Sequence, residues 1–196
     1  MKLGALTATR AGPSVVLATQ GARLILGAGE GTAWALSGDP HDVIGLVLPG
    51  SHPGACGGLI SLLHHLAGRT RPLTIVWPLG DEALAGLIDA TTRAQGGRLP
   101  WTAASEGLPF RLTVGPFQVR LAGGRSPLAH PSVRVQADGV TVAWTADPAD
   151  PAAFAADART ADLAIGPVDD PAIAASLATA RAALGTPRAR PGPPAD

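Results

Sequence analysis

Two glycine-rich segments contain several of the side chains in this sequence that are capable of catalysis or binding. The first is Gly27-Ala28-Gly29-Glu30-Gly31-Thr32, which follows a β-prone run and precedes an expected helix, as the phosphate-binding turn of a dinucleotide site does. That turn needs glycine at its sixth position so that helix and strand can pack closely, and Thr32 stands there. We therefore interpret the segment as a tight strand-to-helix turn, in which Glu30 forms a stabilising hydrogen bond.

The second glycine-rich segment, Pro49–Leu59, contains His52 and Cys56. Loops at the carboxyl ends of strands are where α/β folds place their chemistry. A lone histidine in such a loop is more often structural than catalytic. Cys56 is expected to open a helix, where the helix dipole would favour a thiolate, but burial as a small apolar residue is the simpler interpretation. Because Cys56 is the only cysteine, an internal disulfide is excluded.

The other histidines and the tryptophans give weaker signals. His64 and His65 lie on a leucine-striped segment, and adjacent residues differ by about 100° around a helix. We therefore expect one of them to face solvent and the other to pack at the edge of the stripe. The four tryptophans are dispersed along the chain, which is typical of core or interface positions rather than of a base-stacking platform: Trp34, Trp77, Trp101 and Trp144.

The elements that must position these residues are short strands interleaved with helices. The runs that predict strands are 14–18, 22–26, 43–48, 73–77, 110–114, 117–121, 133–137, 140–145 and 161–165. Asp138-Gly139 predicts a two-residue hairpin turn. Helical spacing predicts helices over 59–66, over a segment capped by Asp81 and ended by Gly96-Gly97, over 151–158, and from 169 to 185. This interleaving predicts an α/β fold with a mixed sheet.

Length and charge limit the classes of protein. A chain of 196 residues corresponds to about one domain, which we assign to residues 1–185, followed by a mobile Pro- and Arg-rich tail over 186–196. The formal net charge is zero and Lys2 is the only lysine, so extended binding to a nucleic-acid backbone is not expected. No apolar run approaches the ~18 residues of a membrane span and no signal-peptide layout is present, so we expect a soluble cytoplasmic protein.

Four segments, in order, resemble the metallo-β-lactamase fold in its ribonuclease Z-like branch. They are Ala22–Thr32, Asp42–Leu48, Gly57–Leu59 and Gly68–Val76, and the most specific part is Gly29-Glu30-Gly31-Thr32. The resemblance covers most of residues 1–168. It implies a four-layer αββα sandwich with mixed sheets.

The resemblance also implies the position of a metal centre. Members of this family hold two divalent metals, usually zinc, around a hydroxide that attacks a phosphoester or amide-like bond. Their first ligands form a His-x-His-x-Asp-His loop after the third of the resembling strands. Here only the second histidine is kept: the corresponding residues are Gly50, His52, Gly54 and Ala55.

Later ligands are only partly kept. His130 corresponds to the next histidine of the family and Asp147 to the metal-bridging aspartate. Gly166-Pro167 replaces the next acidic residue, and we expect the closing strand with its histidine to be absent. His52, His130 and Asp147 would form a workable shell for one zinc with an open position, but a two-metal mechanism is not expected.

These replacements predict a non-catalytic protein, a pseudoenzyme with a scaffold or regulatory role, which needs no cofactor. The alternative is a zinc-dependent hydrolase, of phosphodiesterase or RNA-processing type, with a reduced mononuclear site. A third class is an interaction module that acts as an oligomer. Because loss of the final strand would leave an open sheet edge, we expect a homodimer.

Overall fold

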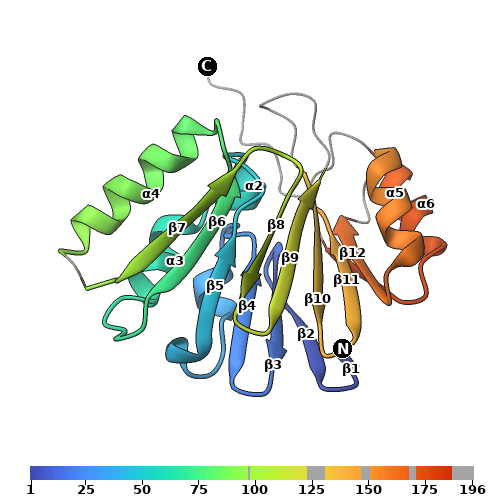
Figure 1. Cartoon of the computed structure of the whole chain (residues 1–196), viewed down its shortest axis with the longest axis horizontal. Helices are drawn as coiled ribbons and strands as arrows, with labels where there is room; N and C mark the ends of the chain where they lie inside the picture. Colours follow the sequence, from blue (N-terminus) through green and yellow to red (C-terminus); the bar gives the residue numbers. More distant parts are fainter. Residues whose placement is uncertain (97, 123–130, 147–150, 168–170, 187–196) are drawn as a thin grey trace.

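The computed structural model describes residues 1–96, 98–122, 131–146, 151–167 and 171–186. Two β-sheets pack face to face, with helices on the outside of each (Figure 1). The helices are α1 (Thr32–Ala35), α2 (Pro53–Cys56), α3 (Leu59–His65), α4 (Glu82–Ala94), α5 (Pro151–Thr160) and α6 (Pro171–Ala178), with a 3-10 turn at Pro40–Asp42.

The first sheet contains seven strands in sequence order: β1 (Lys2–Leu3), β2 (Leu6–Ala11), β3 (Ser14–Thr19), β4 (Ala22–Leu26), β5 (Val43–Val47), β6 (Leu73–Pro78) and β7 (Trp101–Glu106). Strands β1 to β4 pair antiparallel, and β4 to β7 pair parallel. The sheet is therefore mixed, as predicted.

The second sheet has the order β13-β12-β11-β10-β9-β8. Its strands are β8 (Phe110–Val114), β9 (Phe117–Ala122), β10 (Ser132–Ala137), β11 (Val140–Trp144), β12 (Leu163–Pro167) and β13 (Ala183–Thr186). β8 to β11 pair antiparallel and β11 to β13 pair parallel, so this sheet is mixed as well. At the β10–β11 hairpin, Asp138 (φ 51°) and Gly139 (φ 75°) both have positive φ, which confirms the predicted turn.

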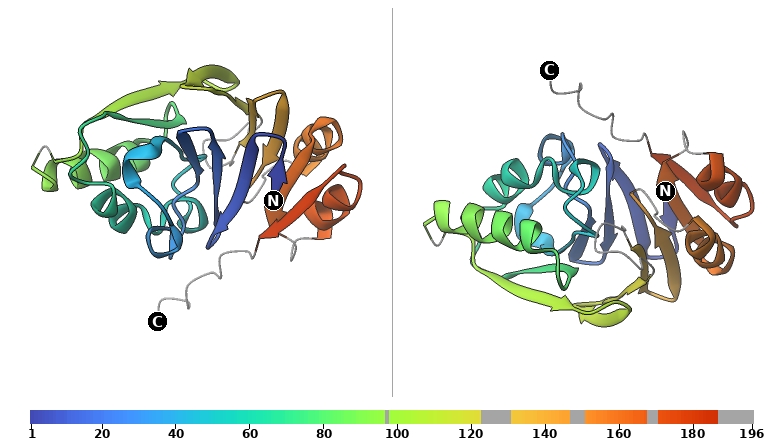
Figure 2. Two further views of the ribbon diagram at one scale, coloured as in Figure 1. Left: turned by 90° about the horizontal axis from the view of Figure 1, so that it is seen from below. Right: turned by 90° about the horizontal axis from the view of Figure 1, so that it is seen from above.

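Three apolar clusters fill the three interfaces between the layers. They arise because successive side chains of a strand point to opposite faces of its sheet. In β4, Leu24 and Leu26 belong to the cluster between the two sheets, and Ile25 belongs to the cluster on the opposite face. That second cluster packs the first sheet against α3 and α4. The third packs Phe154 and Ile173 of α5 and α6 against the second sheet. End views show the same four layers (Figure 2), and the predicted αββα sandwich is confirmed.

The C-terminal part of the described chain differs from the sequence prediction. The helix expected from 169 to 185 is confirmed in part: α6 begins at Pro171 but ends at Ala178, so the extension to 185 was wrong, and the chain returns as β13. The final strand that we expected to be absent is therefore present, paired parallel with β12. Pairing satisfies backbone groups along one edge of β12, including the Ala164 N–H, which donates to the Ala182 carbonyl (2.9 Å). The segment 187–196 of the predicted tail lies outside the described residues.

Among the helices of the described residues, none has the length and apolar character that a membrane span requires.

Candidate functional site

The two glycine-rich segments meet at one end of the sandwich, the upper end in Figure 1, where α2 lies. Gly27, just after β4, packs against Trp144 at the end of β11: a Cβ on Gly27 would be 3.1 Å from the edge of the indole ring. Trp144 is buried between the sheets. The ends of strands from both sheets therefore lie together at this edge.

The turn over 27–32 is held by a closed ring of buried hydrogen bonds. The Gly29 N–H donates to Ser14 Oγ (3.0 Å), and Thr32 Oγ1 donates to the Gly29 carbonyl (2.6 Å). The hydroxyls of Ser14 and Thr32 are 2.7 Å apart. Because the Thr32 proton is used on Gly29, Ser14 donates to Thr32. Thr32 thus closes the turn, whereas Glu30 is exposed.

Hydrogen bonds to His52 and Asp81 hold the loop that follows β5, residues 48–52, which we call the β5 loop. His52 is the N-cap of α2, and its Nδ1 accepts a hydrogen bond from the Gly54 N–H (3.1 Å). Asp81 accepts the Ser51 N–H through one carboxylate oxygen (2.8 Å) and the Leu84 N–H through the other (3.0 Å). Asp81 therefore caps α4, as predicted, and also holds the β5 loop, which sequence spacing does not reveal.

The two glycine-rich segments are joined through their backbones. The Ala28 N–H donates to the Ala55 carbonyl (2.6 Å), and the Gly58 N–H donates to the Ala28 carbonyl (2.7 Å). A Cβ on Gly58 would be 2.4 Å from the Gly29 carbonyl oxygen, and one on Gly29 would be 2.7 Å from that of Gly54. Ala55 is fully buried. Glycine and alanine thus allow two loops to pack directly on each other.

Cys56 does not open a helix, contrary to the sequence prediction. It is the last residue of α2 and is buried. Its Sγ donates to the Ser51 carbonyl (3.1 Å). Burial, with a smaller contribution from the negative charge of Asp81, raises the pKa of the thiol to about 11. The thiol is therefore the stable form, and a nucleophilic thiolate is disfavoured.

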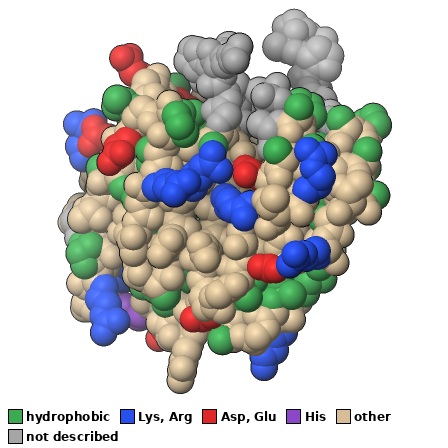
Figure 3. Space-filling view, turned by 45° about the vertical axis from the view of Figure 1, so that its right-hand side comes forward, with side chains coloured by type: hydrophobic (Ala, Val, Ile, Leu, Met, Phe, Trp, Pro, Cys, Tyr) green, Lys and Arg blue, Asp and Glu red, His purple; other side chains and the backbone are tan. Residues whose placement is uncertain are grey.

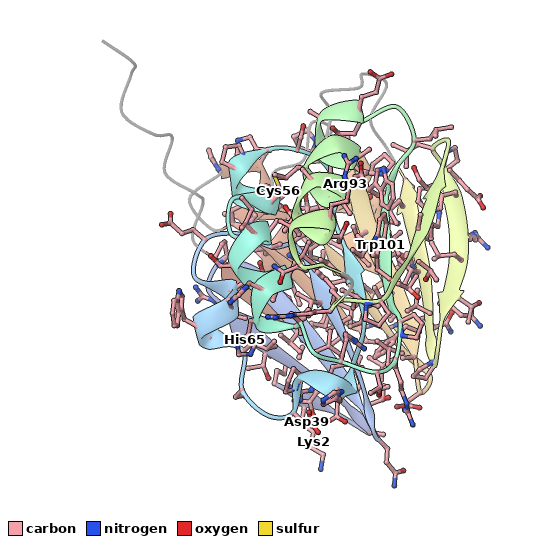
Figure 4. The ribbon with its side chains drawn as sticks, turned by 90° about the vertical axis from the view of Figure 1, so that its left-hand side faces the viewer. Lys2, Asp39, Cys56, His65, Arg93 and Trp101 are labelled. Atoms are coloured by element: carbon pink, nitrogen blue, oxygen red, sulfur yellow. The ribbon has the colours of Figure 1, made fainter. Side chains whose placement is uncertain are left out.

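The two histidines at the end of α3, His64 and His65, lie away from this edge. His64 and His65 are both exposed, so the prediction that one packs at the edge of the stripe was wrong. Figure 4 shows Cys56 and His65 towards opposite ends of the α2–α3 segment. Leu62, Leu63 and Leu66 fill the buried face, and the end of α3 presents two successive positions to solvent.

The tryptophans form no stacking platform in the described part of the chain. Trp77 and Trp101 contact each other with ring centroids 6.3 Å apart. Trp144 is buried, whereas Trp34 on α1 is 89% exposed. Three therefore occupy core or partly buried positions, and Trp34 is the exception.

The predicted metal ligands are not brought together among the residues that the structure describes. His52 lies in the loop after β5, and His130 and Asp147 lie outside the described residues. Within the described ranges, no three His, Cys, Asp or Glu side chains form a group able to hold a metal ion. His52 itself uses Nδ1 as an acceptor, which places the proton of a neutral ring on Nε2. In that form the lone pair of Nδ1 is engaged by the cap and Nε2 carries the proton.

The position that replaces the family's later acidic residue is closely packed by neighbouring side chains. A Cβ on Gly166 would be 2.8 Å from Cγ2 of Ile173 and 3.3 Å from Cγ2 of Thr145. Nearby at the end of β11, the Trp144 Nε1–H and the Thr145 hydroxyl are buried and have no hydrogen-bond partner within the described residues.

Comparison with solved structures decides the fold. The chain is similar to human tRNase Z, short form (ELAC1), with a TM-score of 0.71 and 16% identity over 95% of this chain and 91% of that one. It is also similar to the metallo-beta-lactamase fold protein YhfI from Bacillus subtilis, with a TM-score of 0.65, 17% identity, and coverage of 83% and 65%. The chain has the metallo-β-lactamase fold.

A third similar structure is Zn²⁺-bound PqqB from Methylobacterium extorquens, with a TM-score of 0.61, 16% identity, and coverage of 78% and 58%. The chain spans less than two thirds of the length of YhfI and of PqqB. No family model matches the sequence, and no curated protein matches it. At these identities the similarity establishes the metallo-β-lactamase fold alone.

Proposed function

We propose that this chain is a non-catalytic metallo-β-lactamase-fold protein, a cytoplasmic pseudoenzyme that acts as a scaffold or regulator. The observation that supports this most is the hydrogen bond from the Gly54 N–H to His52 Nδ1. It gives the one kept histidine of the family's loop a structural task.

The hydrogen bond and metal binding make opposite demands on His52. A histidine that binds zinc through one nitrogen usually donates its other N–H to an acceptor. Here Nδ1 faces a donor, so it must be unprotonated, and the neutral ring then carries its proton on Nε2. Zinc binding through either nitrogen would require loss of the cap or loss of that proton.

Among the described residues, those that flank His52 and hold its loop supply no replacement donors for a metal. Gly50 and Gly54 have no side chain, and Ala55 is fully buried against the 27–32 turn. Asp81 already accepts two backbone N–H groups. These contacts of the loop's own support the proposal that the loop does not depend on a metal. A protein that keeps this fold without a reactive hydroxide is suited to binding rather than to hydrolysis.

An activity assay tests the proposal. The full chain, purified after zinc-replete expression, is incubated with bis(4-nitrophenyl) phosphate and with a short single-stranded RNA, with and without EDTA. We expect no turnover above that of the metal alone, and the same result for His52→Ala.

His41→Ala is the matched control, because His41 is exposed on the 3-10 turn away from the β5 loop. Turnover that EDTA abolishes, that His52→Ala removes and that His41→Ala retains would overturn the proposal. That result would favour the reduced, mononuclear hydrolase with His52, His130 and Asp147 as ligands.

A further inference from the structure

A polar hollow lies on the outer face of the second sheet, away from the β5 loop. Its volume is about 270 Å³, and it spans β8, β9 and β10. Its polar lining consists of three arginines and three uncharged side chains: Arg111, Arg120, Arg134, Thr113, Gln118 and Gln136. In the space-filling view that brings this side forward, basic side chains gather near the middle of the face beside an acidic one (Figure 3).

Strand register places the lining residues in two rows. Arg111 is directly opposite Arg120, and Arg120 is directly opposite Arg134. Two residues further along, Thr113, Gln118 and Gln136 form the second row in the same register. Because side chains two apart share a face of a strand, both rows point outwards, while the alternate residues enter the core between the sheets.

A row of three arginines requires compensation, because like charges directly opposite each other on a sheet are destabilising. One carboxylate is provided by α5: Asp157 Oδ1 lies 3.5 Å from Arg120 and 3.8 Å from Arg134. Arg134 is further fixed by donating to Thr160 Oγ1 (2.8 Å). Arg111 is exposed and has no carboxylate partner among the described residues.

Among the described residues, the row of three arginines therefore carries more positive charge than its carboxylate partner balances. Asp157 is shared by two guanidinium groups, and Ser132 also donates to it (2.9 Å). One carboxylate cannot neutralise three guanidinium groups. An oxyanion bound beside Arg111 would relieve this excess, and guanidinium forks match the oxygens of a phosphate group.

We propose that this hollow binds a small phosphorylated molecule, with its phosphate on Arg111 and Arg120, beside Arg134, and its polar remainder on Gln118, Gln136 and Thr113. The hollow lies just under the ~300–1,000 Å³ of pockets for drug-sized ligands, which fits a phosphate with a small attached group. The zero net charge and single lysine of the chain argue against an extended nucleic-acid backbone as the occupant. The site is independent of the β5 loop and of any metal.

Binding is tested by NMR titration of the ¹⁵N-labelled full chain with inorganic phosphate at constant ionic strength. We expect saturable shifts confined to amides of β8, β9 and β10. Arg111→Gln should weaken binding about tenfold or more, since it removes a charge-assisted contact. Arg10→Gln is the matched control, because Arg10 is also an exposed strand arginine but lies on the first sheet.

Thermal unfolding of both variants confirms that they fold. Adenosine monophosphate should bind at the same amides, and adenosine should bind at least tenfold more weakly. Shifts spread over the surface, or equal phosphate binding by wild type and Arg111→Gln, would overturn the proposal. Binding of a short oligoribonucleotide without binding of phosphate or adenosine monophosphate would also overturn it, in favour of a nucleic-acid surface.

Discussion

Cys56 illustrates how burial controls the chemistry of one residue at the site. Its raised pKa means that the folded chain holds the thiol proton more strongly than the unfolded chain does. Its contribution to stability is therefore complete below pH 9.0, the ordinary pKa of a cysteine thiol, and is lost as the pH rises through about 11. The free energy of unfolding of the wild type, relative to that of Cys56→Ala, should fall across this interval.

Urea unfolding of both chains at several pH values measures this difference. Iodoacetamide alkylation gives a second readout, since only the thiolate reacts: native Cys56 should react more slowly than the urea-unfolded chain at pH 8. Equal alkylation rates for the native and the unfolded chain, or a stability difference that does not change with pH, would show that folding does not raise the pKa of the Cys56 thiol.

Gly58 tests the direct packing of the two glycine-rich segments. A Cβ at this position would meet only backbone atoms, the nearest being the Gly29 carbonyl oxygen at 2.4 Å. Because backbone cannot yield as a flexible side chain does, Gly58→Ala should lower the free energy of unfolding by about 2–3 kcal/mol.

Gly86→Ala is the matched control for this substitution. Gly86 lies within α4, and a Cβ there would meet nothing within 4 Å. Alanine should stabilise the helix by about 0.5–1 kcal/mol. Denaturant unfolding compares the two, and a Gly58→Ala chain as stable as wild type would mean that the segments are not in this contact.

At the scale of elements, the cap of α4 also fixes the β5 loop. Asp81→Ala removes both the cap of Leu84 and the acceptor of the Ser51 N–H, so we expect a loss of about 2 kcal/mol. Asp89→Ala on the same helix breaks only an exposed ion pair with Arg93 and should cost about 0.3–0.5 kcal/mol. Faster hydrogen exchange of the Ser51 amide in Asp81→Ala alone would confirm the link to the loop, and unchanged exchange would contradict it.

The sequence predicts many of the elements whose buried faces repeat regularly, although it missed β2. Strand β4, the β10–β11 hairpin and the cap of α4 are as expected, because apolar alternation, an Asp-Gly turn and an N-cap are local signals. β7 was missed because it is an edge strand of small and polar residues that is only partly buried. β13 was missed because its four residues depend on pairing with β12, which is a tertiary contact.

The candidate site shows the same division between local and tertiary signals. The position of His52 in the loop after β5 followed from the sequence. Its role as a cap acceptor did not, because that depends on ring orientation. The contacts of Ser14 with the 27–32 turn and of Asp81 with Ser51 span 15 and 30 residues, beyond the range of any spacing rule.

At the scale of the whole molecule, a homodimer remains our prediction, although its first reason, a missing final strand, was wrong. Within the described residues, the edge strands of each sheet pair on one side only, and Trp34 is 89% exposed. Light scattering should give a mass that rises with concentration towards twice 19.6 kDa. A constant mass of one chain at all concentrations would contradict this prediction.

We propose above that hydrogen bonds, instead of zinc, hold the β5 loop of this chain. The most direct test is the zinc content of the full chain, measured by mass spectrometry of the metal after zinc-replete expression and gel filtration. We expect far less than one zinc per chain, and the same content in His52→Ala. One or two zinc ions per chain, lost in His52→Ala or Asp147→Ala, would contradict it.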